Sequence, residues 1–95
     1  MRMSNKIIEK AVNHYGKEYQ TIVCMEECSE LIKECSKMLR GIGNPHHLAE
    51  EIADVYICLE MLEEMYEIRS VDLVDWKARK LVRLNERMEG ECGKC

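Results

Sequence analysis

With 95 residues, a formal net charge of −4 and no Phe, the chain has the size of one small domain and a composition that disfavours an all-β sandwich. No apolar run approaches the roughly 18 residues needed to span a bilayer, and residues 1–6 lack the apolar core of a signal peptide, so we expect a cytoplasmic protein with no membrane partner. Residues 26–67 hold eleven acids against three bases, a net charge of −8 that argues against a nucleic-acid partner and suits a bound cation.

Four helices are predicted from the spacing of apolar residues and from helix start and stop signals. Gly16 and Gly41 are typical of helix C-terminal stops, and Asn44-Pro45 is typical of an N-cap and first turn. The predicted helices cover about residues 4–15, 17–39, 45–67 and 70–88, with Gly90 ending the last one. We therefore predict one all-α, four-helix bundle-like domain over residues 1–89, followed by a disordered tail at residues 90–95.

The third predicted helix is apolar around most of its circumference, through Ile52, Val55, Tyr56, Ile57, Cys58, Leu59, Met61, Leu62 and Met65. A bundle of this size cannot easily cover so much apolar surface by itself. We therefore expect self-association that completes the fold, as a homodimer or a homotetramer. The five aromatic residues are interpreted as core or interface residues, although one of them could stack on a base.

Six cysteines are present, and four of them (Cys24, Cys28, Cys35 and Cys58) occupy helical positions among apolar neighbours. We interpret these four as reduced core thiols, because nothing in the sequence indicates secretion. Cys92 and Cys95 form a lone CxxC in the tail. A structural zinc site would need a second pair of ligands at matching spacing, so we interpret the two thiols as part of a disordered tail. The alternatives are intermolecular oxidation or adventitious metal binding at these thiols.

Two carboxylates lie inside the apolar stripe of the third predicted helix. At about 100° per residue, Glu51 and Asp54 fall on the side of Cys58 and Leu62, whereas Glu60, Glu63 and Glu64 fall on the other side. On the second predicted helix, Glu27, Glu30 and Glu34 form one ridge, and Glu26 points further out. Because an ionised carboxylate is costly to bury unpaired, the inward acids need partners or a metal.

If the second and third helices are antiparallel, Glu27 and Glu30 face Glu51 and Asp54. Four oxygen donors without His or Cys suit Mg²⁺, with Mn²⁺ as a possible substitute. The alternative is a buried ion network with the basic residues of the fourth helix. Spacing alone leaves the metal site and the ion network equally open.

The fourth predicted helix carries a cation in its apolar stripe, because Lys77 projects among Leu73, Leu81 and Leu84. Lys80, Arg83 and Arg87 follow on one flank. The long Lys77 stem can serve a structural role by extending its ammonium to solvent. The functional alternative is that Lys77, Lys80 and Arg83 or Arg87 hold anionic oxygens, such as substrate phosphates, beside the bound cation.

The two acidic motifs together resemble a known signature. Glu26-Glu27-Cys28-Ser29-Glu30 followed by Glu51-Ile52-Ala53-Asp54 has the pattern Glu-Glu-x-x-Glu … Glu-x-x-Asp. This pattern resembles the MazG-like, all-α nucleoside triphosphate pyrophosphohydrolases, over roughly residues 15–88. The chain is most similar to the small single-domain members found in phages and their bacterial hosts.

The resemblance implies a Mg²⁺ site formed by Glu27, Glu30, Glu51 and Asp54, with Glu26 as an auxiliary acid. It implies hydrolysis of a nucleoside or deoxynucleoside triphosphate between the α and β phosphates, and Glu27 or Glu30 is expected to orient the attacking water. Lys80 matches a lysine of the family, whereas Leu84 stands where relatives have an asparagine. Two alternatives to catalysis are a non-catalytic oligomeric helical module and a nucleotide-binding regulator that lacks turnover.

Overall fold

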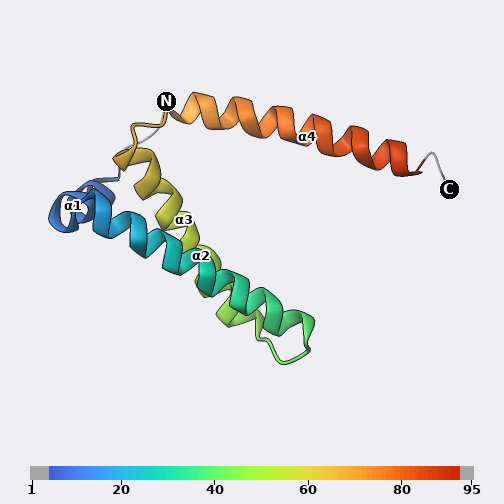
Figure 1. Ribbon diagram of the computed structural model, residues 1–95, viewed down its shortest axis with the longest axis horizontal. Coiled ribbons are helices and arrows are strands. Elements are labelled where there is room, and N and C mark those ends of the chain that lie inside the picture. The colour runs from blue at the N-terminus through green and yellow to red at the C-terminus, as the bar shows by residue number, and fades with distance from the viewer. Residues whose placement is uncertain (1–4, 93–95) are drawn as a thin grey trace. The chain divides into compact units, whose positions relative to one another are not determined.

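The structure is a computed structural model that describes residues 5–92, and all regular secondary structure in this part of the chain is α-helical (Figure 1). The helices are α1 (Lys6–Tyr15), α2 (Lys17–Leu39), α3 (Pro45–Met65) and α4 (Ser70–Cys92). The prediction of an all-α protein with four helices is confirmed. None of the described helices is long and apolar enough to cross a membrane.

The chain divides into two compact units, which are described separately. Residues 5–67 form one unit with α1, α2 and α3, and residues 68–92 form the other with α4. The prediction of a single domain over residues 1–89 stays a prediction. Residues 93–95, which include Cys95, lie outside the described part of the chain.

Asparagine side chains cap the N-termini of two helices, and one of these caps, Asn44, was predicted. Asn5 Oδ1 accepts hydrogen bonds from the backbone N–H groups of Ile7 (2.9 Å) and Ile8 (3.3 Å). Asn44 Oδ1 accepts from the backbone N–H of His46 at 2.8 Å. These bonds satisfy donors that have no partner within the first helical turn, which is why α1 and α3 begin where the sequence predicts.

Two helix ends differ from the prediction. The helix α3 stops at Met65 instead of Glu67, because Glu67 adopts a left-handed backbone with φ of 52° that cannot continue a helix. The helix α4 passes through Gly90 and ends at Cys92, so residues 90–92 are helical and the predicted stop is wrong. A glycine ends a helix when it takes a positive φ, and Gly90 does not.

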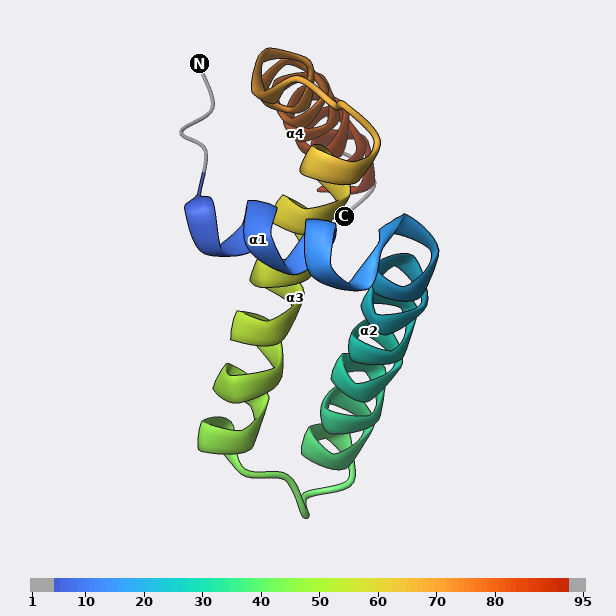
Figure 2. The same cartoon turned by 90° about the vertical axis from the view of Figure 1, so that its left-hand side faces the viewer.

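In the first unit, α2 and α3 form an antiparallel hairpin, and α1 crosses one end of it on one face (Figure 2). The core is small and consists of Cys24, Cys58 and Met65, with Val12, Met61 and Leu62 packed against it. Ile8 of α1 is also buried. The core therefore lies at the end of the hairpin that α1 covers, and the rest of the hairpin has two accessible faces.

The four helical cysteines are free thiols, but only two of them are in the core. The Cys24 thiol donates to the Cys58 carbonyl at 3.5 Å. Burial raises the pKa of the Cys58 thiol to about 12 and also raises the pKa of Cys24, so both stay protonated at neutral pH. Cys28 and Cys35 are exposed, which corrects the prediction that all four are core residues. Cys28 lies about 40° around α2 from the buried Cys24 and lines a groove together with Leu62 of α3, so it sits at the edge of the contact between the two helices.

A close approach in the α2–α3 loop gives a testable prediction about stability. A Cβ on Gly43 would lie 2.6 Å from Met38 Sδ and 2.7 Å from the Met38 backbone nitrogen. Gly43→Ala is therefore expected to lower the free energy of unfolding by about 1–3 kcal/mol, measured by urea denaturation. Gly90→Ala is the matched control, because nothing lies within 4 Å of its Cβ position. A Gly43→Ala protein as stable as the control would contradict this packing.

Candidate metal centre

Three of the predicted carboxylates meet on one face of the hairpin. Glu27 of α2 and the i, i+3 pair Glu51 and Asp54 of α3 each place an oxygen within 4.8 Å of the others. All three side chains are half-buried. They come together because α2 and α3 run antiparallel, so that residues 27 and 51–54 lie at the same level of the hairpin. Their role as metal ligands stays a prediction at this point.

Glu51 has an unsatisfied oxygen. Its Oε2 atom is buried and has no hydrogen-bond partner among the described residues. Burial raises the pKa of the Glu51 carboxyl, and the charges of Asp54, Glu30, Glu34 and Glu50 raise it further. A buried carboxylate oxygen without a donor is unfavourable, and a proton or a cation would satisfy it.

Glu27 of α2 and Asp54 of α3 lie close together across the two helices. A hydrogen bond between their side chains raises the pKa of Glu27, and burial and the charges of Asp54, Glu51 and Glu30 add to the increase. Two carboxylates can share a hydrogen bond only when one of them holds a proton. Without a cation, the cluster therefore retains protons that dispersed surface acids would release.

Glu30 does not join the cluster. It is exposed, and its oxygens are not among those that lie within 4.8 Å of one another. Its charge nevertheless raises the pKa of both Glu27 and Glu51, so it lies at the rim. The i, i+3 step from Glu27 rotates Glu30 about 60° around α2, away from α3. The structure thus brings together three of the four predicted ligands.

The two auxiliary acids have different surroundings. Glu26 is exposed, as predicted from its position on α2, and its backbone carbonyl accepts a 3.0 Å hydrogen bond from the Ser29 hydroxyl. Glu34 is buried and forms an ion pair with Lys37, with 3.2 Å between Lys37 Nζ and Glu34 Oε2. This pair, which the i, i+3 spacing could have indicated, provides Glu34 with a charge partner outside the cluster.

The opposite face of the hairpin is apolar. A groove of about 350 Å³ is lined by Thr21, Cys24, Met25, Cys28, Ser29, Ile32 and Leu62. Met25 is 66% exposed and Ile32 is 70% exposed, and Leu59 of α3 is also exposed. We call Met25, Ile32, Leu39, Ile52 and Leu59 the apolar face. On α2 it lies about 120–160° around from Glu27, and on α3 it lies about 80–100° from Glu51 and about 140–160° from Asp54.

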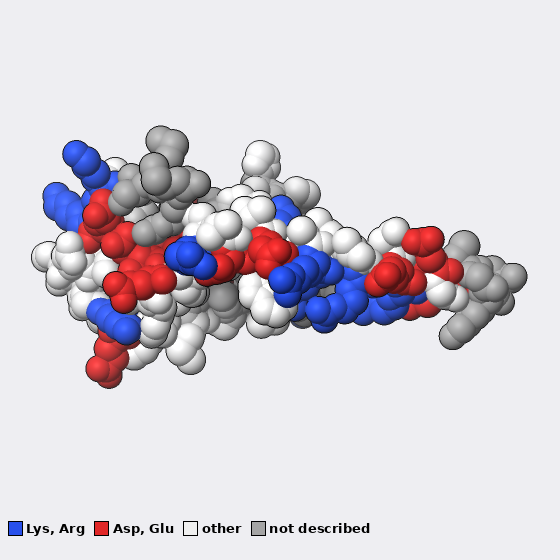
Figure 3. All heavy atoms as spheres, turned by 90° about the horizontal axis from the view of Figure 1, so that it is seen from above, with Lys and Arg blue, Asp and Glu red and all other residues white. Residues whose placement is uncertain are grey.

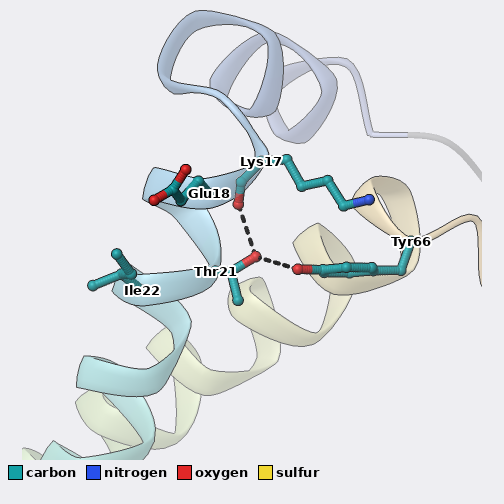
Figure 4. A pocket seen from close by; sticks show the side chains of 5 residues that line it. All are labelled: Lys17, Glu18, Thr21, Ile22 and Tyr66. Carbon is teal, nitrogen blue, oxygen red and sulfur yellow. Dashed lines mark hydrogen bonds between the residues drawn. The ribbon is translucent and has the colours of Figure 1, made fainter.

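A cavity of about 530 Å³ opens near the start of α2 (Figure 4). Its lining residues are Lys17, Glu18, Thr21, Ile22 and Tyr66. The Thr21 hydroxyl donates to the Lys17 carbonyl at 2.7 Å and lies 2.8 Å from the Tyr66 hydroxyl, while Lys17 Nζ sits 4.3 Å from the centre of the Tyr66 ring. The polar groups of this cavity largely satisfy one another, and none of them belongs to the predicted site.

The predicted phosphate ligands all lie on α4. Lys77, Lys80 and Arg83 are exposed, and the basic side chains form a band along this helix (Figure 3). Lys80, Arg83, Leu84 and Arg87 line a hollow of about 360 Å³. Arg79 and Lys80 also approach the Trp76 ring, at 5.5 Å and 5.9 Å from its centre. Their action on phosphates beside the carboxylates stays a prediction.

The carboxylate cluster has a definite chemical character. It offers hard oxygen donors from two rigid helices, and one of these oxygens is buried and unpaired. Such a donor set fits Mg²⁺ or Mn²⁺ better than zinc or copper.

Comparisons with family models, with curated proteins and with solved structures gave no match.

Proposed function

We propose that the protein is a Mg²⁺-dependent nucleoside triphosphate pyrophosphohydrolase of the MazG-like all-α type. It cleaves a nucleoside or deoxynucleoside triphosphate between the α and β phosphates and releases the monophosphate and pyrophosphate. The observation that carries the proposal is the convergence of Glu27, Glu51 and Asp54 around the unpaired Glu51 Oε2. The resemblance of the two acidic motifs to the family signature supports it.

Glu27, Glu51 and Asp54 would hold the metal ion. When bound, Mg²⁺ would neutralise the phosphates and stabilise the charge that develops on them during hydrolysis. The cluster alone repels a triphosphate, because the surrounding segment of residues 26–67 has a net charge of −8. The metal requirement of the reaction follows from this repulsion.

Glu30 is the better placed of the two candidates for orienting the attacking water. Glu27 shares a hydrogen bond with Asp54, so its carboxylate is engaged within the cluster. Glu30 is exposed at the rim, one helical turn from Glu27, and its charge still acts on the cluster. A carboxylate in this position can accept a proton from a water molecule that approaches the bound phosphates.

We also propose that the protein is a homodimer or a homotetramer built on the apolar face. Light scattering at micromolar concentration is expected to give at least twice the mass of one chain. Ile32→Glu places a charge on this face and is expected to reduce the mass to that of a monomer. Lys33→Glu, on the neighbouring exposed residue outside the face, is the matched control and should keep the oligomer. A monomeric wild-type protein would remove the proposal of self-association.

The proposed activity is tested by incubating the protein with a panel of nucleoside triphosphates, with and without Mg²⁺, and measuring pyrophosphate. Release that depends on Mg²⁺ and on Asp54 supports the proposal. Tight nucleotide binding without product would indicate a regulator. No binding and no product would indicate a non-catalytic helical module.

A further inference from the structure

A cluster of aromatic rings lies where α1 meets α2. His14 and Tyr15 make an edge-to-face contact with 4.6 Å between ring centres, and Tyr15 stacks on Tyr19 at 5.1 Å with 17° between the rings. Gly16, with φ of 91°, lets the chain turn within one residue and so brings the last turn of α1 against the first turn of α2. Tyr15 and Tyr19 are 54% and 55% exposed, so neither ring is part of the core.

A hollow of about 270 Å³ lies beside these rings. It is lined by Ile7, Lys10, Ala11, His14 and Tyr15, all from α1. Pockets for drug-sized ligands measure about 300–1,000 Å³, so this hollow suits one ring system more than a complete nucleotide. Its walls combine an apolar floor, an aromatic ring, an imidazole and an ammonium group. Lys10 forms no ion pair within residues 5–92 and is free to bind a ligand.

The hollow and the carboxylates border the same face of the hairpin. Val12 of α1 packs on the core cluster that contains Cys24 and Cys58. Glu27 lies one turn beyond Cys24 along α2, and Asp54 lies one turn from Cys58 along α3. Met61 packs against the same core cluster and lies nearly in line with Asp54 along α3. The helix α1 therefore crosses the hairpin on the face that carries the carboxylates (Figure 2). The apolar face lies on the other side.

We propose that the α1 hollow, together with the stacked Tyr15 and Tyr19 rings, binds the base of the substrate nucleotide. This inference rests on the proposed function. A nucleotide whose phosphates lie at Glu27, Glu51 and Asp54 extends its sugar and base along the hairpin, and α1 stands about one helical turn away in that direction. A flat aromatic ring recognises any base by stacking, and polar side chains beside it select among bases.

The polar side chains favour bases with keto groups. The Lys10 ammonium donates hydrogen bonds and cannot accept them, and the His14 imidazole can also donate one. Guanine offers an acceptor at O6, and thymine or uracil offers one at O4, whereas adenine and cytosine present amino donors at these two positions; N7 is an acceptor in both purines and does not discriminate. The hollow therefore selects guanine, uracil or thymine nucleotides over adenine and cytosine nucleotides.

The test compares steady-state constants for GTP, UTP, ATP, CTP and a deoxyribose 5′-triphosphate that has no base. The wild-type KM is expected to be about tenfold lower for GTP or UTP than for ATP or CTP. Tyr15→Leu should raise KM about tenfold for all four nucleotides with kcat nearly unchanged, and should not affect the base-free substrate. Lys10→Met should raise KM only for GTP and UTP. Lys33→Met is the matched control at an exposed position away from the hollow.

Binding of a nucleotide that cannot be hydrolysed tests the base site independently of any catalytic activity. The α,β-methylene analogue of GTP has no cleavable bond between these phosphates, and its affinity can be measured by calorimetry for wild type, Tyr15→Leu and Tyr15→Phe. Tyr15→Leu should bind about tenfold more weakly, and Tyr15→Phe, which keeps the ring, should bind like wild type. Equal affinity of all three proteins overturns the base site. Loss of hydrolysis with this binding pattern intact overturns the proposed function alone.

Discussion

Asp54→Asn is expected to reduce pyrophosphate release by at least about a hundredfold at saturating nucleotide and Mg²⁺. The substitution removes the charge that couples Glu51 to Glu27, and the amide nitrogen cannot ligate a metal ion. The shape of the side chain is retained, so the hairpin should fold as in the wild type. The measurement is an enzyme-coupled pyrophosphate assay over the nucleotide panel, with EDTA in a parallel set of reactions.

Glu60→Gln is the matched control for Asp54→Asn. Glu60 is also a half-buried acid of α3, but it does not belong to the carboxylate cluster. Its substitution should leave pyrophosphate release within about twofold of the wild-type rate. Release that continues in EDTA, or that survives Asp54→Asn undiminished, would contradict the metal-dependent mechanism. Comparable losses in both variants would mean that a general change of charge, and not the cluster, determines the rate.

The metal-free protein is expected to lose stability as the pH rises above the ordinary carboxyl pKa of 4.5. The pKa values of Glu27 and Glu51 are raised in the folded protein, so over this range the folded state binds more protons than the unfolded state. Stability falls with pH wherever the folded state holds the extra protons. At a pH below the ordinary carboxyl pKa, both states are protonated and this cost disappears. Calorimetric melting in EDTA across this pH range measures the effect.

Glu51→Gln should flatten this pH dependence and stabilise the metal-free protein at about pH 8. The amide removes the buried charge and can still fill the space around the unpaired Oε2 position. Mg²⁺ should raise the melting temperature of the wild type by about 10 °C or more at 100 times its Kd, and should have little effect on Glu51→Gln. An ion network predicts the opposite: no effect of Mg²⁺, and destabilisation by Glu51→Gln with or without metal.

The sequence predicted the helices well because their ends are marked by local chemistry. Asn5, Asn44 and Gly16 act within one turn of the chain, so their effects can be read without knowing the fold. Helical periodicity and one short loop were enough to predict that Glu27 faces Glu51 and Asp54. Glu30 could not be placed in the same way. A rotation of about 60° around α2 determines whether its carboxylate lies at ligand distance from the cluster or at the exposed rim.

Other features depend on packing between helices, which the sequence does not encode locally. The exposure of Cys28 and Cys35 follows from which side of α2 meets α3, and the periodicity of α2 is consistent with more than one side. Tyr15 and Tyr19 were expected in the core or an interface. The positive φ of Gly16 determines that they stack on each other at the surface. The sequence predicted that the first helix ends at Gly16, but it did not predict the orientation of α1 relative to α2.

Because α1 crosses the hairpin as a separate helix, its exposed residues and the carboxylates of α2 and α3 can change independently during evolution. Within the described chain, α1 contributes little more than Ile8 and Val12 to the core. Its remaining residues, among them the walls of the hollow, can therefore change while the carboxylates of α2 and α3 stay in register. Under the proposed function, a lineage could change its nucleotide preference by substitutions in one short helix, without altering the proposed metal ligands.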